Sequence, residues 1–222
     1  MAAEPRPSLK ESRERELVEA TRALFDERGM QDAPVEEIAR SVGIARGLIY
    51  RQFSSKEELF VLTVTDYLAE LADRLERSAA VDDDPILRLD RTARDYLAFC
   101  RDYPAFLDCS LSLMRRPSDR LQDEISESVW LRLGTGMAAC IGPLARVLAE
   151  GMASGDFTID DPDKHANLLW TQSLGAMHLA RIRVGLRQDD DGSPALFLLD
   201  GDELVDSLMH GLFAQVGCVA PS

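Results

Sequence analysis

The chain has 222 residues and a formal net charge of −14 at pH 7, with 45% hydrophobic and 29% charged residues. This composition is typical of a soluble globular protein and excludes a disordered or fibrous chain. The segment from Met1 to Ser12 lacks the hydrophobic run of a secretory signal, and polar and basic side chains interrupt the richest apolar stretch, residues 168–186. We therefore expect a cytoplasmic protein without a transmembrane helix.

Charge is distributed unevenly along the chain. Residues 1–60 contain 10 basic and 12 acidic side chains, whereas residues 61–222 contain 15 and 27. DNA phosphates need Lys or Arg as partners, and an acidic body is repelled by them. Any contact with nucleic acid is therefore expected within the first sixty residues.

The predicted elements are helices, and the first spans about Leu9 to Arg28. A second begins at Pro34 and ends at Gly43, with apolar residues at helical spacing between them. A third helix, from Ala45 to Gln52, follows after a turn of a few residues. Two short helices around a glycine-containing turn predict a helix-turn-helix over residues 34–53.

The prediction continues with helices. Ser54 is expected to cap a fourth helix, and a fifth covers about Ile86 to Arg101. Pro104 and Pro117 bracket a sixth, and a long seventh helix then reaches about Ser154.

The last part of the chain is predicted as two helices joined by a loop. The eighth helix runs from Asp161 to about Arg187, and the ninth from Glu203 to Val216. Residues 188–202, rich in Asp, Gly and Pro, form the loop. No segment shows sustained alternation of apolar and polar residues, so no strand or hairpin is expected. The predicted fold class is all-α, with about nine helices.

Residues Glu16 to Leu62 read ELVEATRALFDERGMQDAPVEEIARSVGIARGLIYRQFSSKEELFVL. They resemble the tetracycline-repressor (TetR) family of transcriptional regulators. The resemblance is carried by Ala20, Leu24, Phe25, Gly29, Val35, Ile38, Ala39, Gly43, Gly47, Ile49, Tyr50, Phe53 and the stretch Ser55 to Leu59.

This resemblance implies a ligand-responsive homodimer that binds double-stranded operator DNA. The simplest form is a repressor, released from a palindromic operator by a small, largely apolar effector of unknown identity. The expected parts are a flexible N-terminal arm (1–10), a three-helix DNA-binding domain (11–71) and a helical ligand-binding and dimerisation domain (72–222).

A recognition helix packs one face on its domain and shows the other to base edges in the major groove. Ile44, Ile49 and Phe53 supply the packed face. A glycine within a helix is unfavourable, so Gly47 indicates close approach to a phosphate. Leu48 is expected to face the groove, with packing inside the domain as the alternative. The residues expected at DNA are Ala45, Arg46, Gly47, Leu48, Tyr50, Arg51, Gln52 and Lys56.

By resemblance, Tyr50 and Lys56 contact phosphates, although Lys56 can also be an ordinary solvated lysine. The sequence departs from the family where Ala33, Pro34 and Ala45 replace capping hydroxyls. These losses leave open a helical adaptor or binding protein of the same fold without operator recognition.

Aromatic and methionine side chains suit an apolar ligand cavity, although each can also be plain bundle core. The pocket candidates are Phe99, Tyr103, Phe106, Met114, Trp130, Met137, Trp170, Met177 and His178. The ninth helix has an apolar arc wider than one core contact needs, which implies a dimer interface. The interface candidates are Leu204, Val205, Leu208, Met209, Leu212 and Phe213.

No enzyme motif occurs in the sequence: there is no G-x-S-x-G, P-loop, H-E-x-x-H or dinucleotide glycine pattern. Cys100, Cys109, Cys140 and Cys218 are scattered, without metal-ligand spacing. We expect no catalytic residue, metal or cofactor.

Overall fold

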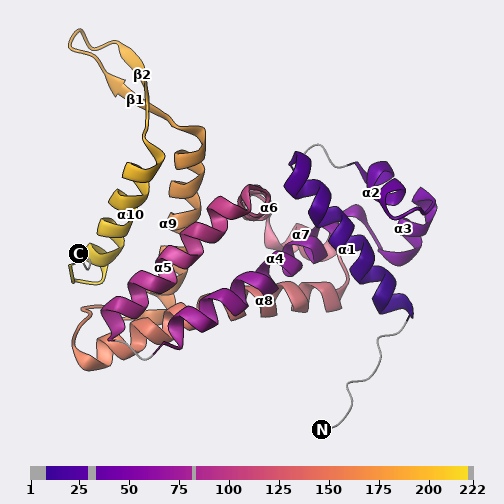
Figure 1. Cartoon of the computed structure of the whole chain (residues 1–222), viewed down its shortest axis with the longest axis horizontal. Helices are drawn as coiled ribbons and strands as arrows, with labels where there is room; N and C mark the ends of the chain where they lie inside the picture. Colours follow the sequence, from indigo (N-terminus) through magenta and orange to yellow (C-terminus); the bar gives the residue numbers. More distant parts are fainter. Residues whose placement is uncertain (1–8, 30–33, 82–83, 220–222) are drawn as a thin grey trace. The chain divides into compact units, whose positions relative to one another are not determined.

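The structure, a computed structural model, describes residues 9–29, 34–81 and 84–219. Figure 1 shows them as helices with one small antiparallel sheet. The elements are α1 (Leu9–Arg28), α2 (Val35–Ser41), α3 (Arg46–Gln52), α4 (Lys56–Ala79), α5 (Pro85–Asp102), α6 (Pro104–Met114), α7 (Ser118–Glu124), α8 (Glu127–Ser154), α9 (Pro162–Ile182), β1 (Val184–Gln188), β2 (Pro194–Leu198) and α10 (Gly201–Gln215). The all-helical fold class is confirmed, with ten helices among the described residues rather than about nine.

The helices divide into two compact units. Unit 1 contains the chain up to Glu70 together with Tyr103–Met137, and unit 2 contains Leu71–Asp102 together with the chain from Ala138 onward. The division at Glu70 lies beside the boundary expected after residue 71. Residues 103–137, expected in the second domain, are grouped with the N-terminal helices.

The first three helices of unit 1 share an apolar core. α1 buries Leu17, Leu24 and Phe25, while α2 and α3 bury Ile38 and Ile49. Burying a side chain of this size stabilises the fold by about 1.5–3 kcal/mol. This packing fixes α2 and α3 on α1.

A mostly buried arginine joins α1 to α4 within unit 1. Arg22 pairs with Asp66 at 2.8 Å and also with Glu70, and its guanidinium lies 4.2 Å from the centre of the Tyr67 ring. The Tyr67 hydroxyl donates to Asp26 at 2.6 Å. Because the Arg22 side chain is only 16% exposed, these pairs are poorly screened by water and hold the two helices together firmly.

The start of α4 differs from the prediction, because Ser55 and not Ser54 caps the helix. The Ser55 hydroxyl accepts a hydrogen bond from the backbone N–H of Glu58 at 3.0 Å. The Glu58 carboxylate in turn accepts from the backbone N–H of Ser54 at 2.6 Å. The result resembles a capping box, shifted by one residue.

The predicted long seventh helix is wrong, since the chain forms α7 and α8 with a break between them. Ile125 adopts an extended backbone and buries its side chain. The hydroxyl of the following Ser126 donates to Glu58 at 2.6 Å. Contacts with residues distant in the sequence therefore interrupt the helix.

In unit 2, α9 and α10 pack side by side (Figure 1). Both begin with an aspartate cap: Asp161 accepts from the N–H of Lys164 at 3.0 Å, and Asp200 accepts from the N–H of Glu203 at 3.1 Å. Phe213 of α10 is completely buried. The pair is thus anchored at its helix starts and in its core.

The predicted absence of strands is wrong as well. α9 ends at Ile182 rather than near Arg187, because Arg183 adopts a left-handed backbone with φ 55°. The residues that follow form β1 and β2, a hairpin that projects from the end of the α9–α10 pair (Figure 1). The sequence does contain a signal, because Asp191-Gly192 lies between the two apolar-containing stretches 184–188 and 194–198, and Asp-Gly favours a hairpin turn.

The hairpin has one covered face and one open face. The Phe197 ring covers Gly185 so closely that a Cβ there would overlap it. Arg187 lies 5.8 Å from the centre of the same ring. The opposite face is apolar and 41–81% exposed, and consists of Val184, Leu186, Leu196 and Leu198.

The expected N-terminal arm (1–10) lies mostly outside the described residues, as does Ala33, while Leu9 and Lys10 belong to α1. None of the described helices combines the length and the apolar character that a membrane crossing requires.

Candidate functional site

The α2–α3 segment has the geometry of a helix-turn-helix. Gly43, in the turn, has a φ of +68°, a conformation that favours glycine. Ile49 and Phe53 are 1% and 3% exposed, which places them on the packed face as predicted. Ile44 is half-buried. The opposite face of α3 is therefore turned away from the rest of unit 1.

The outward face of α3 contains most of the residues predicted at DNA. Ala45, Arg46, Gly47, Tyr50 and Arg51 are exposed, and Lys56 is exposed at the first position of α4. Leu48 and Gln52 are half-buried, so Leu48 is less exposed than its position suggested. Six of the eight residues predicted at DNA are thus exposed.

Arg46 is held by neighbours on α2 and α3. Its guanidinium lies 2.5 Å from the Glu36 carboxylate and donates to the Tyr50 hydroxyl at 3.4 Å. The hydrogen bond to Tyr50 and the charge of Glu36 raise the pKa of Arg46. An anionic partner would have to compete with Glu36 for this cation.

The other polar groups differ in how tightly they are engaged. Gln52 donates to the backbone carbonyl of Lys10 at 3.2 Å, which ties α3 to the start of α1. Lys56 lies 3.6 Å from the carboxylate of Glu57. Within the described residues Arg51 makes no hydrogen bond or ion pair, which leaves its guanidinium available to an external acceptor.

Gly47 is not required by the packing of the chain itself. A Cβ built at this position meets no atom within 4 Å. Glycine in a helix costs about 1 kcal/mol relative to alanine, so its presence here needs another reason. Close approach of an external backbone or phosphate to α3 is such a reason.

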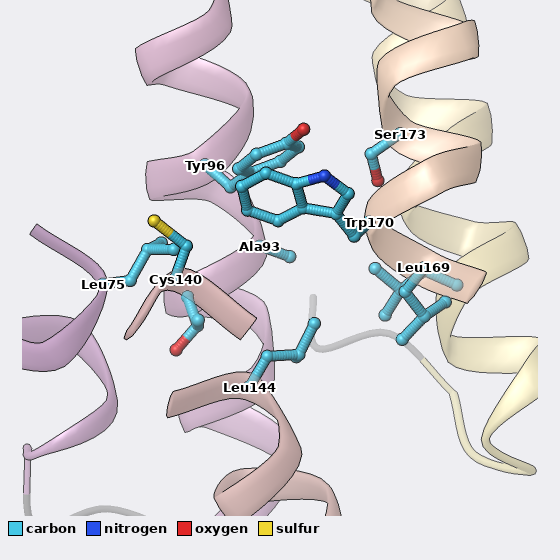
Figure 2. Close-up of a pocket in the computed structure, with 10 residues that line it drawn as sticks. Leu75, Ala93, Tyr96, Cys140, Leu144, Leu169, Trp170 and Ser173 are labelled. Carbon is cyan, nitrogen blue, oxygen red and sulfur yellow. The ribbon is translucent and has the colours of Figure 1, made fainter. Parts of the chain in front are cut away.

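Unit 2 contains a cavity of about 30 Å³ between its helices. Figure 2 shows the Tyr96 ring beside the Trp170 indole at one end of the cavity and Leu144 at the other. The centres of the two rings lie 4.7 Å apart. The cavity is lined by Leu75, Thr92, Ala93, Tyr96, Cys140, Leu144, Leu169, Trp170, Ser173 and Leu212.

Two buried hydroxyls in this lining lack a hydrogen-bond partner among the described residues. They are Thr92 Oγ1 and the Tyr96 hydroxyl, which belong to residues 2% and 6% exposed. Burial raises the pKa of Tyr96 well above its usual value, and Cys100, a weak hydrogen-bonding group, contributes. The Tyr96 hydroxyl therefore stays protonated and can donate a hydrogen bond.

The predicted pocket candidates do not share one place. Trp170 lines the cavity, whereas Phe99, Met177 and His178 belong to unit 2 without lining it. The remaining candidates belong to unit 1: Tyr103, Phe106, Met114, Trp130 and Met137. Thr92, Tyr96 and Ser173 were not predicted as pocket residues, although the i, i+4 spacing of Thr92 and Tyr96 places both on one face of α5.

Unit 1 has a surface hollow of about 250 Å³, lined in part by Lys56, Glu57 and Arg116. Its charged groups have partners within the chain: Lys56 pairs with Glu57, and Arg116 lies 3.6 Å from Glu124. No buried unpartnered polar atom of the described residues belongs to its lining. Unlike the cavity of unit 2, this hollow therefore has no buried polar group that needs a ligand as its partner.

The interface candidates on α10 fall into two groups. Met209, Leu212 and Phe213 are at most 4% exposed and belong to the core of unit 2. Leu204, Val205 and Leu208 are half-exposed. A partner can therefore reach only the second group without disturbing the core.

The cysteines are free thiols. Cys100, Cys109 and Cys140 are buried, and burial raises the pKa of each to about 12. They are therefore protonated at neutral pH and unreactive. Across residues 9–29, 34–81 and 84–219, no group of His, Cys, Asp or Glu side chains is arranged to hold a metal ion.

A helix-turn-helix with a cationic outward face, joined to a helical body, defines the class of helix-turn-helix DNA-binding folds. Comparison with known proteins identifies the family that the chain's N-terminal segment resembles. Residues 17–62 match the model of bacterial regulatory proteins of the tetR family. The resemblance of this segment to the TetR family is thereby confirmed.

One relative matches the chain over a limited stretch, and two solved structures share its fold. The chain is 35% identical over 83 residues to the HTH-type transcriptional regulator BetI 2 of Chromohalobacter salexigens, a match that spans 36% of this chain and only 40% of that relative. A tetR-family regulatory protein from Rhodococcus RHA1 superposes with a TM-score of 0.65 at 16% identity, covering 96% of this chain and 100% of that one. The regulator FadR of Bacillus subtilis, solved in complex with stearoyl-CoA, gives 0.64 at 15% identity, covering 92% and 98%. These structures show a shared fold.

Proposed function

We propose that this protein is a DNA-binding transcriptional regulator that acts as a homodimer and responds to a small, largely apolar effector. The observation that carries the proposal is the outward face of α3, with exposed cations and a glycine that the chain's own packing does not need. The simplest mode is repression, in which the effector releases the protein from its operator. The family model that residues 17–62 match describes regulatory proteins rather than enzymes.

On DNA, the exposed side chains of α3 would enter the major groove. Arg46 and Arg51 can donate to guanine or to phosphate, and Tyr50 and Lys56 would hold phosphates. One helix reads only a few base pairs, so specific recognition requires two copies. A two-fold dimer then demands a palindromic site with half-sites about one helical turn apart.

The dimer interface is proposed on the exposed faces of α9 and α10. Leu168 and Gly175 on α9, and Leu208 and Gly211 on α10, lie on these faces. A Cβ at either glycine would meet no atom within 4 Å, so a partner helix can approach closely there. The open face of the hairpin adds exposed apolar surface that a dimer interface could bury.

This interface is tested by the variant Gly175→Arg. A bulky charge at the centre of a helix–helix contact should convert the dimer to a monomer at micromolar concentration, without loss of helical signal in circular dichroism. Gly134→Arg, at an exposed helical glycine outside α9 and α10, is the matched control. Sedimentation of the Gly175 variant as a dimer would place the interface elsewhere.

The effector is proposed to bind in unit 2, where the apolar cavity lies. A ligand that prefers one conformer of the dimer shifts the population toward it and thereby changes the spacing of the two α3 helices. The structurally similar FadR was solved with stearoyl-CoA, so this fold accommodates a ligand with a long apolar chain.

Gel shift with the DNA upstream of the protein's own gene tests the proposal. The wild type should bind one fragment specifically, and Arg51→Ala should weaken that binding. Arg77→Ala, which removes an exposed arginine from unit 2, should leave it unchanged. If neither that fragment nor a selected random library is bound specifically, the protein is instead a helical adaptor of the same fold, the alternative suggested by the absent capping hydroxyls at Pro34 and Ala45.

A further inference from the structure

The cavity of unit 2 combines an apolar lining with hydroxyls that the chain does not satisfy. Thr92 and Tyr96 are both more than nine-tenths buried; Thr92 Oγ1 has no hydrogen-bond partner among the described residues, and the Tyr96 hydroxyl has only the weakly bonding Cys100 thiol beside it. Leaving a buried hydroxyl unpaired is costly, and most such groups in native proteins have a partner. Two such residues on adjacent turns of α5, both lining one cavity, point to a polar ligand atom within that cavity.

The lining also restricts the charge of that ligand. None of the ten lining residues is charged. An ionised group buried here would lose its hydration without gaining a counter-ion, which is strongly unfavourable. A molecule that fits this cavity is therefore neutral in the part that is buried.

The aromatic pair restricts its shape. The Tyr96 and Trp170 rings lie with their centres 4.7 Å apart and their planes tilted by 42°, and form one wall of the cavity (Figure 2). Leu75, Leu144 and Leu169 supply further apolar contacts around it. Aromatic rings prefer offset or edge contacts with other rings, so a planar ring is the shape best matched to this wall.

We propose that unit 2 binds a neutral, planar ring compound that bears an oxygen, held between α5 and α9 with its oxygen hydrogen-bonded to Thr92 and Tyr96. The proposal rests on the proposed function, because it takes this cavity as the effector site. It adds the chemical class of the effector and the two residues that select it. The Tyr96 hydroxyl donates to the ligand oxygen, and the Thr92 hydroxyl can donate or accept.

The size of the cavity gives the binding step a structural consequence. About 30 Å³ is room for little more than one water molecule, so a ring compound must displace a lining side chain. Leu144, which is half-buried and lies at the end of the cavity away from the Tyr96–Trp170 pair (Figure 2), is the residue we expect to move. Ligand binding is thereby coupled to a rearrangement of α8 against α5.

The test uses the fluorescence of Trp170. The chain has two tryptophans, so Trp130→Phe leaves Trp170 as the single reporter. This variant is titrated with benzyl alcohol, with toluene as the ring without oxygen, and with benzoate as the charged ring. Benzyl alcohol should change the emission saturably and bind more tightly than toluene, while benzoate should not bind.

Substitution of each hydroxyl then identifies its role. Thr92→Val and Tyr96→Phe should each weaken benzyl alcohol binding by roughly two- to tenfold and leave toluene binding unchanged. Thr63→Val is the matched control, because that buried hydroxyl already donates to the Leu59 carbonyl at 2.9 Å. Circular dichroism verifies that each variant is folded, and either hydroxyl variant alone suffices for the comparison.

Several results would overturn the proposal: equal affinity for benzyl alcohol and toluene, binding of benzoate, no saturable change of Trp170 emission, or hydroxyl variants that bind benzyl alcohol like the wild type. Because the fluorescence titration uses no DNA, its result does not depend on whether the protein binds an operator. If the ring compound binds as expected but never alters operator affinity, this site stands and ligand control of DNA binding fails.

Discussion

Two glycines inside helices show how differently the two units use the same residue. In the part of α8 that belongs to unit 2, a Cβ at Gly151 would overlap the ring of Phe157. In α3 of unit 1, a Cβ at Gly47 would meet no atom within 4 Å. Gly151 is therefore required by the packing of its own unit, whereas Gly47 is explained only by something outside the chain.

The helix starts show the same contrast. Asp161 and Asp200 cap α9 and α10 with side-chain hydrogen bonds. Pro34 and Ala45 stand at the same position before α2 and α3 and make none. Unit 2 thus satisfies its helix ends internally, while the helix-turn-helix gives up local stability. Surfaces that must adapt to a partner are generally drawn from the less stable parts of a fold.

Gly151→Ala should have the largest effect on the free energy of unfolding. A neutral variant would contradict the contrast between Gly151 and Gly47. The added methyl group must displace the Phe157 ring in a packed region, which costs about 1–3 kcal/mol in the free energy of unfolding. Urea denaturation followed by circular dichroism measures this value. Gly134→Ala in the same helix, where a Cβ meets nothing within 4 Å, should be neutral or stabilising.

Lys56→Ala should weaken DNA binding about tenfold if the lysine holds a phosphate, because hydrogen bonds to charged groups contribute about 1.5 kcal/mol or more. The loss should be the same for all DNA sequences, and the slope of log affinity against log salt should fall by about one unit. Lys164→Ala, in the first turn of α9, is the control. An unchanged slope would leave Lys56 as a solvated surface lysine.

Leu48 tests, at the level of one methyl group, whether the outward face of α3 contacts DNA. Half-buried in the free protein, it is expected to touch a thymine methyl in the major groove. Replacing thymine by uracil at one half-site position should weaken the wild type by about 1 kcal/mol and leave Leu48→Ser indifferent. Equal sensitivity of both proteins at every position would assign Leu48 to packing within unit 1.

Exchanging caps between the units tests the second contrast. Asp161→Ala should lower the free energy of unfolding by about 1 kcal/mol, because the N–H of Lys164 loses its acceptor. Ala45→Ser should raise it by a similar or smaller amount, since Ala45 already has the extended backbone of an N-cap. Thermal denaturation of both variants, with Asp161→Asn as the conservative control, reports the two signs.

Gly47→Ala should have the smallest effect on stability and the opposite sign to Gly151→Ala. Alanine favours the helix by up to about 1 kcal/mol, and the structure has room for its methyl group. Operator affinity should nevertheless fall, because the methyl group obstructs the approach to the DNA backbone. A variant that is more stable and binds DNA as tightly as the wild type would remove the external explanation for Gly47.

Most of the helices could be predicted because their signals are local. α1 has the predicted bounds, and α2 and α3 begin within one residue of the predicted positions. Apolar spacing in α1 and α2, and Gly43 in the turn between α2 and α3, are properties of short stretches of chain. The break between α7 and α8 could not be read in this way, because it depends on Glu58 accepting a hydrogen bond from Ser126.

The sequence by itself determined the all-helical class and the helix-turn-helix with its outward face, because helical periodicity and the family pattern lie within a continuous segment. Only the tertiary structure decided which residues line the cavity. Thr92 and Tyr96 of α5 face Trp170 of α9 and Leu212 of α10, and no local pattern states that these helices meet. Packing also decided that Phe213 is core rather than interface, since an apolar arc on one helix does not reveal which part of it the chain covers itself.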